Sequence, residues 1–171
     1  MITTLTVAPP PHAVTDDQVR LVQDSFRLVL PIRKEAAALF YGRLFALDPG
    51  TAPLFAGTDL EAQGAKLMAA LGFVVGALRR PESMLDTVRA LAVRHLRYGV
   101  ADAHYTSVGA SLLWTLEQGL GAACTPEVKA AWAAAYGMLS ATMIDAAHAA
   151  ASSLAAQAAC ASLPGEAMAA G

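Results

Sequence analysis

The sequence is poor in charge, in aromatic residues and in cysteine. Of its 171 residues, 15% are charged and 6% are aromatic, and only Cys124 and Cys160 are cysteines. These two cysteines form no metal-binding motif, and a pair of this kind in a cytosolic protein is more often reduced than bridged. A formal net charge of −2 also excludes the basic surface on which nucleic-acid binding depends.

A long apolar run is missing as well. Hydrophobic residues make up 56% of the chain, but no stretch of 18 or more is strongly apolar and free of polar groups. The region 146–163 comes nearest, and it is interrupted by one histidine, one glutamine and several serines. Residues 1–14 lack the basic start and apolar middle of a secretion signal and contain three consecutive prolines. We therefore expect a cytoplasmic protein without a membrane span and with a flexible lead-in at 1–14.

What the chain has in abundance is alanine, the best helix former, together with signals for helix starts. The residues from Thr15 to Gln18 form a capping box, Asp102 is placed to cap a helix, and Thr125 precedes a proline at the first helical position. Apolar residues at helical spacing predict helices over 15–30, 35–47, 51–55, 60–78, 82–97, 102–120 and 125–147 or beyond. With no strand pattern, this predicts one all-α domain over 15–147, either a bundle or a globin. An extended Ala/Ser-rich tail, partly helical or disordered, is expected over 148–171.

The candidate chemistry centres on His95. It ends a basic helical stretch, with Leu91 one turn earlier. Gln63 lies 32 residues upstream on an apolar helix, and Phe55 comes just before that helix. A lone helical histidine is more often a surface or hydrogen-bonded core residue than a ligand. The other three histidines are not accompanied by such a pattern of residues, so we interpret them as solvent-facing or structural. One histidine, one polar residue on a facing helix and a phenylalanine at the corner suit a haem clamped between helices.

On these residues the chain resembles the globins, closest in pattern to bacterial single-domain haemoglobins and the haem domains of flavohaemoglobins. The resemblance spans about 15–147 and implies a three-over-three helical sandwich that binds haem b. It places His95 as the iron ligand with Leu91 beneath the porphyrin, and Gln63 at the distal position with Leu67 against the bound gas. The resemblance also assigns Phe55 to packing on the haem at the corner before the distal helix. It places Lys66 and Arg94 at the propionates, and Val100, Tyr105 and Val108 in the pocket.

Tyr41 resembles the tyrosine of the second globin helix, 14 residues before Phe55. The alternative is that Tyr41 is an ordinary core aromatic, because the neighbouring Phe40 allows the helix to be registered one residue off. If Tyr41 faces the pocket, Tyr41 and Gln63 both present hydrogen-bond donors to bound O₂. Glutamine is also a poor iron ligand, which favours an open sixth position, although Lys66 or Tyr41 could still bind iron in the unliganded protein.

Two departures limit the expected activity. Flavohaemoglobin haem domains carry a glutamate on the last helix behind the proximal histidine, and here Ala147 stands at that position while Tyr105 keeps the partner tyrosine. Without the carboxylate we expect no strong increase in the basicity of the imidazole. The chain also shows no Gly-rich dinucleotide motif, and its length leaves no room for a flavin or nicotinamide domain. We therefore expect any turnover to need electrons from outside.

Two functions follow from the resemblance. The first is a globin that binds O₂, NO or CO and oxidises NO to nitrate with an external reductase, with Tyr41 and Gln63 as its catalytic residues. The second is a non-enzymatic O₂-binding, storage or gas-sensing protein. A third and least specific interpretation is an alanine-rich helical bundle without a cofactor. The expected assembly is a monomer or a weak homodimer.

Overall fold

The computed structural model describes residues 13–161, and these residues fold into helices joined by short turns. No strand occurs within this range. The α-helices are α1 (Asp16–Val29), α2 (Arg33–Leu47), α3 (Leu60–Ala77), α4 (Leu85–Arg97), α5 (Asp102–Leu120) and α6 (Pro126–Ala161). Short 3-10 segments connect them: η1 (Leu30–Ile32), η2 (Pro49–Phe55), η3 (Pro81–Met84) and η4 (Gly121–Ala123). The expected helices are all present, with ends that differ by a few residues.

Local capping explains where several helices begin. The Thr15 capping box is confirmed, with Thr15 Oγ1 accepting from the Gln18 amide at 3.2 Å. The Thr125 hydroxyl likewise accepts from the Val128 amide at the start of α6. The expectation for Asp102 is wrong, because Asp102 is the first helical residue of α5. The His104 ring instead accepts a hydrogen bond from the Ala101 amide at 3.0 Å and satisfies that donor.

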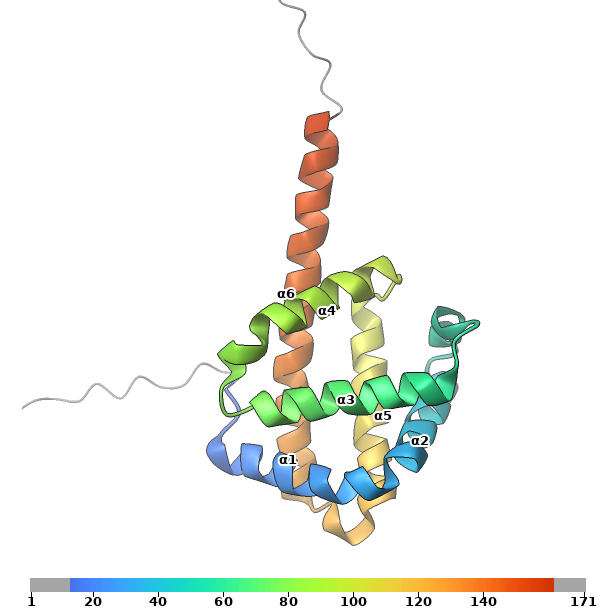
Figure 1. Ribbon diagram of the computed structural model, residues 1–171, viewed down its shortest axis with the longest axis vertical. Coiled ribbons are helices and arrows are strands. Elements are labelled where there is room, and N and C mark those ends of the chain that lie inside the picture. Colours follow the sequence, from blue (N-terminus) through green and yellow to red (C-terminus); the bar gives the residue numbers. More distant parts are fainter. Residues whose placement is uncertain (1–12, 162–171) are drawn as a thin grey trace, which may run out of the picture.

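The helices are arranged around the antiparallel pair α5 and α6, which run side by side while α1, α3 and α4 cross them (Figure 1). Helix α2 packs on both α3 and α5. The main core lies among α1, α2, α3, α5 and α6, and in it the Trp132 indole donates to the buried Ser25 hydroxyl at 2.9 Å. A second buried cluster beneath α4 consists of Met84, Val88, Ala92, Tyr105 and Met143. This cluster fixes how α4 lies against α5 and α6.

Two glycines allow helices to approach closely. A Cβ atom on Gly64 of α3 would lie 2.8 Å from the Cβ of Ala37 on α2. A Cβ atom on Gly109 of α5 would lie 2.5 Å from the ring of Tyr136 on α6. Both distances are well inside van der Waals contact, so these crossings require glycine. The first crossing sets the separation of α2 and α3, the two helices that carry Tyr41 and Gln63.

A hydrogen-bonded clamp holds the corner between α2 and α3. Asp48 ends α2, and its Oδ2 accepts from the Ser107 hydroxyl of α5 at 2.8 Å. The buried Thr51 donates its hydroxyl to the Asp48 carbonyl at 2.7 Å. These bonds tie η2, and Phe55 at its end, to the middle of the fold. We call this arrangement the Asp48 clamp.

Helix α6 extends well past the other helices, and its last turns project from the body (Figure 1). Residues 151–160 on this extension are exposed. The expected boundary at 147 coincides with no break in the helix, because α6 continues to Ala161. The rest of the predicted tail, 162–171, and most of the predicted lead-in, 1–12, lie outside the described residues. Within the described range, no helix is long and apolar enough to cross a membrane.

We expect Gly64→Ala to destabilise the fold by about 1–3 kcal/mol, since the added methyl group forces α2 and α3 apart. The matched control is Gly42→Ala on α2, where a Cβ would meet nothing within 4 Å. That change should stabilise by about 0.5–1 kcal/mol through lost backbone entropy. Urea unfolding of both variants measures the difference. Equal stability of the two would show that the crossing does not need glycine.

We expect Ser107→Ala to lower the free energy of unfolding by about 1–3 kcal/mol, because it leaves the half-buried Asp48 carboxylate without its donor. Ser83→Ala is the control, since it removes an exposed hydroxyl that bonds only a nearby carbonyl. It should change the free energy by less than about 0.5 kcal/mol. A loss in Ser107→Ala no larger than that of the control would mean that the Asp48 clamp is not stabilising.

Candidate functional site

His95 lies in the last turn of α4 and is half-buried. Its Nδ1 atom is 2.9 Å from the carbonyl oxygen of Leu91, one turn earlier. Because a carbonyl can only accept, Nδ1 carries the hydrogen and the lone pair lies on Nε2. Nε2 makes no hydrogen bond to any residue in the described part of the chain. The ring is therefore oriented with one nitrogen open to a ligand.

The surroundings of His95 also keep it uncharged. Burial lowers the pKa of the imidazole from its usual 6.5, and the positive charge of Arg94 lowers it further. The hydrogen bond to Leu91 acts in the opposite direction but is the smaller effect. Only a neutral imidazole has a lone pair for a metal ion, so the environment favours the form that coordinates iron.

Tyr41 is buried on α2, and the structure brings it together with Gln63 on α3. Burial raises the pKa of the Tyr41 hydroxyl, and the interaction with the Gln63 side chain lowers it by a smaller amount. A phenol with a raised pKa stays protonated at neutral pH and so keeps its hydrogen-bond donor. The two polar groups that sequence spacing singled out thus share one location, formed where α2 and α3 cross.

Tyr41 and Phe40 are neighbours on α2 but contact different side chains. The Tyr41 ring packs edge-on against Phe55, with ring centres 5.3 Å apart, and also contacts Phe45. Phe40 instead lines a small interior cavity of about 20 Å³ together with Phe26 and Trp132. Both residues belong to the main core, but Tyr41 contacts the rings of Phe45 and Phe55 near the Asp48 clamp. That Tyr41 faces a ligand pocket stays a prediction.

The other predicted site residues fall into two groups, one exposed to solvent and one at least half-buried. Lys66 and Arg94 are exposed on α3 and α4, as groups reaching the edge of a cofactor must be. Those that are at least half-buried are Phe55, Leu67, Leu91, Val100, Tyr105 and Val108. Leu91 and Val100 pack against the cluster beneath α4, which includes Tyr105. Leu67 and Leu91 lie on α3 and α4, Tyr105 and Val108 on α5, Phe55 at the end of η2, and Val100 in the turn after α4.

Ala147 is buried on α6, so no carboxylate lies at this position. Its polar neighbours Asp145 and His148 are exposed, and His148 Nε2 is 2.9 Å from Asp102 Oδ2. Sequence reasoning missed a nearby contact, in which the Tyr136 hydroxyl donates to the backbone oxygen of Tyr105 at 2.6 Å. This bond fixes α6 against α5 behind the site. The only signal for it was the pair of tyrosines itself.

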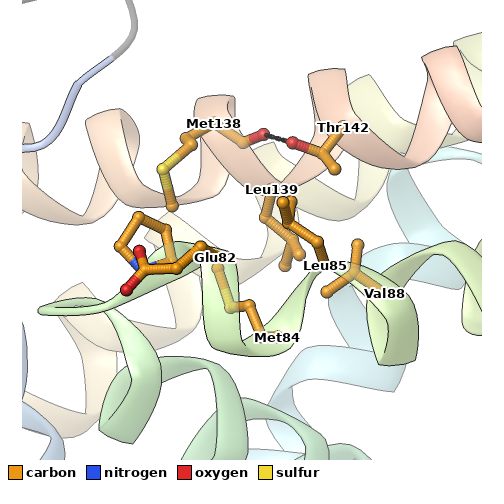
Figure 2. A pocket seen from close by; sticks show the side chains of 8 residues that line it. Glu82, Met84, Leu85, Val88, Met138, Leu139 and Thr142 are labelled. Carbon is orange, nitrogen blue, oxygen red and sulfur yellow. Dashed lines mark hydrogen bonds between the residues drawn. The ribbon is translucent and has the colours of Figure 1, made fainter.

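A cavity of about 300 Å³ lies between the start of α4 and α6 (Figure 2). Its walls are largely apolar and include Met84, Leu85 and Val88 on one side and Met138 and Leu139 on the other. The Thr142 hydroxyl at its edge already donates to the Met138 carbonyl. Because this cavity is at the opposite end of α4 from His95, it does not form part of the candidate site.

The residues of the site fit a haem group. A planar macrocycle needs one neutral imidazole nitrogen for its iron, apolar walls and cations at its carboxylate edge. His95 supplies the nitrogen, because its Nε2 atom is open and its Nδ1 atom is already bonded. Phe55, Leu67 and Leu91 supply apolar surface, and Lys66 and Arg94 are exposed cations. No residue named here conflicts with that use.

Comparison with known proteins extends these observations. The globin family model matches residues 38–143. The flavohemoproteins of Bordetella pertussis and Bordetella bronchiseptica are each 35% identical over 107 residues, which is 61% of this chain and 27% of theirs. The chain therefore spans about a quarter of the length of these curated relatives.

Solved structures show the same fold. A bacterial globin from Campylobacter jejuni superposes with a TM-score of 0.73 at 24% identity and covers 81% of this chain and 99% of its own. An engineered carbene transferase, made from a proposed nitric oxide dioxygenase of Rhodothermus marinus, superposes with a TM-score of 0.75 at 25% identity. It covers 83% of this chain and 99% of its own. The predicted three-over-three helical fold is thereby confirmed, and the chain belongs to the globin family.

Proposed function

We propose that this protein binds haem b through His95, binds O₂ reversibly and oxidises NO to nitrate with electrons from an external reductase. The observation that carries the proposal is the pairing of Tyr41 with Gln63 across α2 and α3, in a fold whose α4 presents an open imidazole nitrogen. The flavohemoprotein relatives and the engineered carbene transferase support it. The chain has no Cys-x-x-Cys-His sequence, which favours haem held without covalent attachment.

Haem, when bound, supplies the iron that holds diatomic gases and changes oxidation state. The protein's own residues do the rest. Tyr41 and Gln63 would donate hydrogen bonds to bound O₂ and stabilise its partial negative charge. The rings of Phe45 and Phe55 pack around Tyr41 and exclude water from it. The overall reaction combines NO, O₂ and one electron to give nitrate.

A second candidate function is gas binding without turnover, for storage or sensing. The observation in its favour is the exposed extension of α6, which offers a surface for contact with another protein. The experiment that separates the two is NO consumption by the oxygenated protein, measured with and without a reductase. Catalytic consumption that continues only with the reductase supports the dioxygenase. A single stoichiometric reaction that the reductase cannot renew supports the binding protein, and absence of a Soret band from protein expressed with sufficient haem overturns both.

We expect His95→Ala to lose haem or retain it weakly, because no other group on α4 offers an oriented imidazole. His148→Ala is the matched control, since His148 is exposed and bonds only Asp102. The measurement is haem content per chain after purification, together with the rate of haem transfer to an apo-globin acceptor. Equal haem content in both variants would refute the assignment of His95.

We expect Tyr41→Phe to raise the O₂ dissociation rate about 5- to 150-fold, the effect of losing one hydrogen bond of about 1–3 kcal/mol. CO carries less charge on its outer atom, so its dissociation rate should change much less. Tyr136→Phe is the control, because it deletes a hydroxyl that already bonds the Tyr105 carbonyl. Stopped-flow ligand displacement gives the O₂ and CO dissociation rates of the unaltered protein and of both variants. An unchanged O₂ rate in Tyr41→Phe would mean that its hydroxyl does not reach the ligand.

A further inference from the structure

The last turn of α4 presents an exposed cationic and aromatic face. Arg94, Arg97 and Tyr98 are exposed, and Tyr98 is 68% exposed, the highest value among the large hydrophobic side chains described. Residues at spacings of three and four lie on one face of a helix. The Tyr98 amide bonds back to the Arg94 carbonyl at 3.1 Å, so the turn keeps this arrangement. We call Arg94, Arg97 and Tyr98 the α4 basic face.

Arg94 and Arg97 of the α4 basic face lack carboxylate partners, as do Arg33, Arg43, Lys66, Arg79 and Arg80, but within the described residues it is the α4 basic face that shares a helical turn with His95. Five of the other lysines and arginines form ion pairs: Arg20 with Asp17, Arg27 with Asp24, Lys34 with Glu61, Arg89 with Asp86 and Lys129 with Glu117. Neither Arg94 nor Arg97 forms an ion pair within residues 13–161. The α4 basic face is therefore locally positive, although the chain as a whole has a net charge of −2.

The α4 basic face lies close to the candidate iron ligand. His95 belongs to the same turn, and its ring is held between α4 and the interior while the arginines point outward. An electron donor that contacts Arg97 and Tyr98 would lie next to the candidate iron ligand. Exposed tyrosine and arginine side chains are also the residues that most often dominate binding at protein interfaces. In Figure 1, α4 lies at the opposite side of the body from α1.

We propose that the α4 basic face is the docking surface for an acidic electron-carrier protein, whose carboxylates would pair with Arg97 and Arg94 around Tyr98. The proposal rests on the proposed function, since it names the chemistry of the partner that the reaction needs. In the step itself, one electron leaves the reduced carrier and reduces the oxidised haem protein, and no bond forms or breaks. Complementary charge would steer the encounter and raise its rate at low salt.

A simpler role for these arginines is to stabilise the C-terminal end of α4, where cations interact favourably with the helix dipole. Arg94 could in addition contact a haem propionate. The two roles differ in what they predict for Arg97. If Arg97 only stabilises the helix end, its replacement lowers the melting temperature and does not change the rate of reduction by any donor. If Arg97 is a docking contact, its replacement slows reduction by a carrier protein but not reduction by a small molecule.

The test uses the haem-loaded full chain and stopped-flow reduction of its oxidised form. The probe is a reduced plant-type [2Fe–2S] ferredoxin, an acidic one-electron carrier, and an uncharged photoreduced deazaflavin is the small-molecule reference. Arg97→Glu reverses the charge on the face. Arg20→Glu is the matched control, because it makes the same change in net charge on α1, where Arg20 is exposed. Arg97→Lys keeps the charge, and Tyr98→Ser removes the ring.

The ferredoxin should reduce the unaltered protein at a rate that falls as salt rises. Arg97→Glu should slow that reduction about fivefold to tenfold at low salt, the size of a steering effect, while Arg20→Glu and Arg97→Lys change it less than about twofold. Tyr98→Ser should slow it at high salt as well, and the deazaflavin rate should be the same in all variants. Equal ferredoxin rates in Arg97→Glu and Arg20→Glu, or no salt dependence, would overturn the docking surface.

The same samples separate this proposal from the proposed function. A protein without a Soret band would contradict the haem function before any reduction is measured. A haem-loaded protein that ferredoxin reduces through the α4 basic face, yet that does not consume NO, would keep the docking surface and refute the dioxygenase. Thermal melting of Arg97→Glu and Arg97→Lys reports the contribution of the helix dipole independently.

Discussion

The hydrogen bond between the His95 ring and the Leu91 carbonyl is the interaction on which the site depends. It decides which ring nitrogen carries the hydrogen, so it decides which one is open to iron. Burial acts in the same direction, because it lowers the pKa of the imidazole and keeps the ring neutral. Since donor and acceptor are one helical turn apart, the bond needs only that α4 be a helix through His95. The cluster beneath α4 then holds that helix against α5 and α6.

The opposite side of the site is set by contacts between distant segments. Tyr41 and Gln63 meet because α2 and α3 cross closely at Gly64 and Ala37. The Asp48 clamp holds the corner that carries Phe55, and Phe55 in turn packs against Tyr41. Tyr41 and Gln63 interact with each other there, which reduces the cost of burying two polar groups. This corner of the fold is closely packed, whereas Lys66 and Arg94 are exposed.

Two further features concern α6 and the end of α4. Ala147 is buried on α6, and within the described residues the Leu91 carbonyl is the hydrogen-bond partner of the His95 ring. A carbonyl makes an imidazole less basic than a carboxylate would. Arg94 and Arg97 at the end of α4 are exposed and form no ion pair within residues 13–161.

The sequence by itself determined what depends on neighbours along the chain. Helix positions followed from apolar spacing and caps such as Thr15. The prediction for His95 rested on Leu91 one turn before it together with Phe55, Gln63 and Leu67 upstream. Only the tertiary structure decided that Tyr41 rather than Phe40 faces Phe55, because that depends on how α2 is rotated against its neighbours. It also decided the Asp48–Ser107 bond, whose partners are 59 residues apart and carry no local signal. Hydrogen bonds within one turn can be predicted from spacing, whereas those between helices exist only once packing brings the helices together.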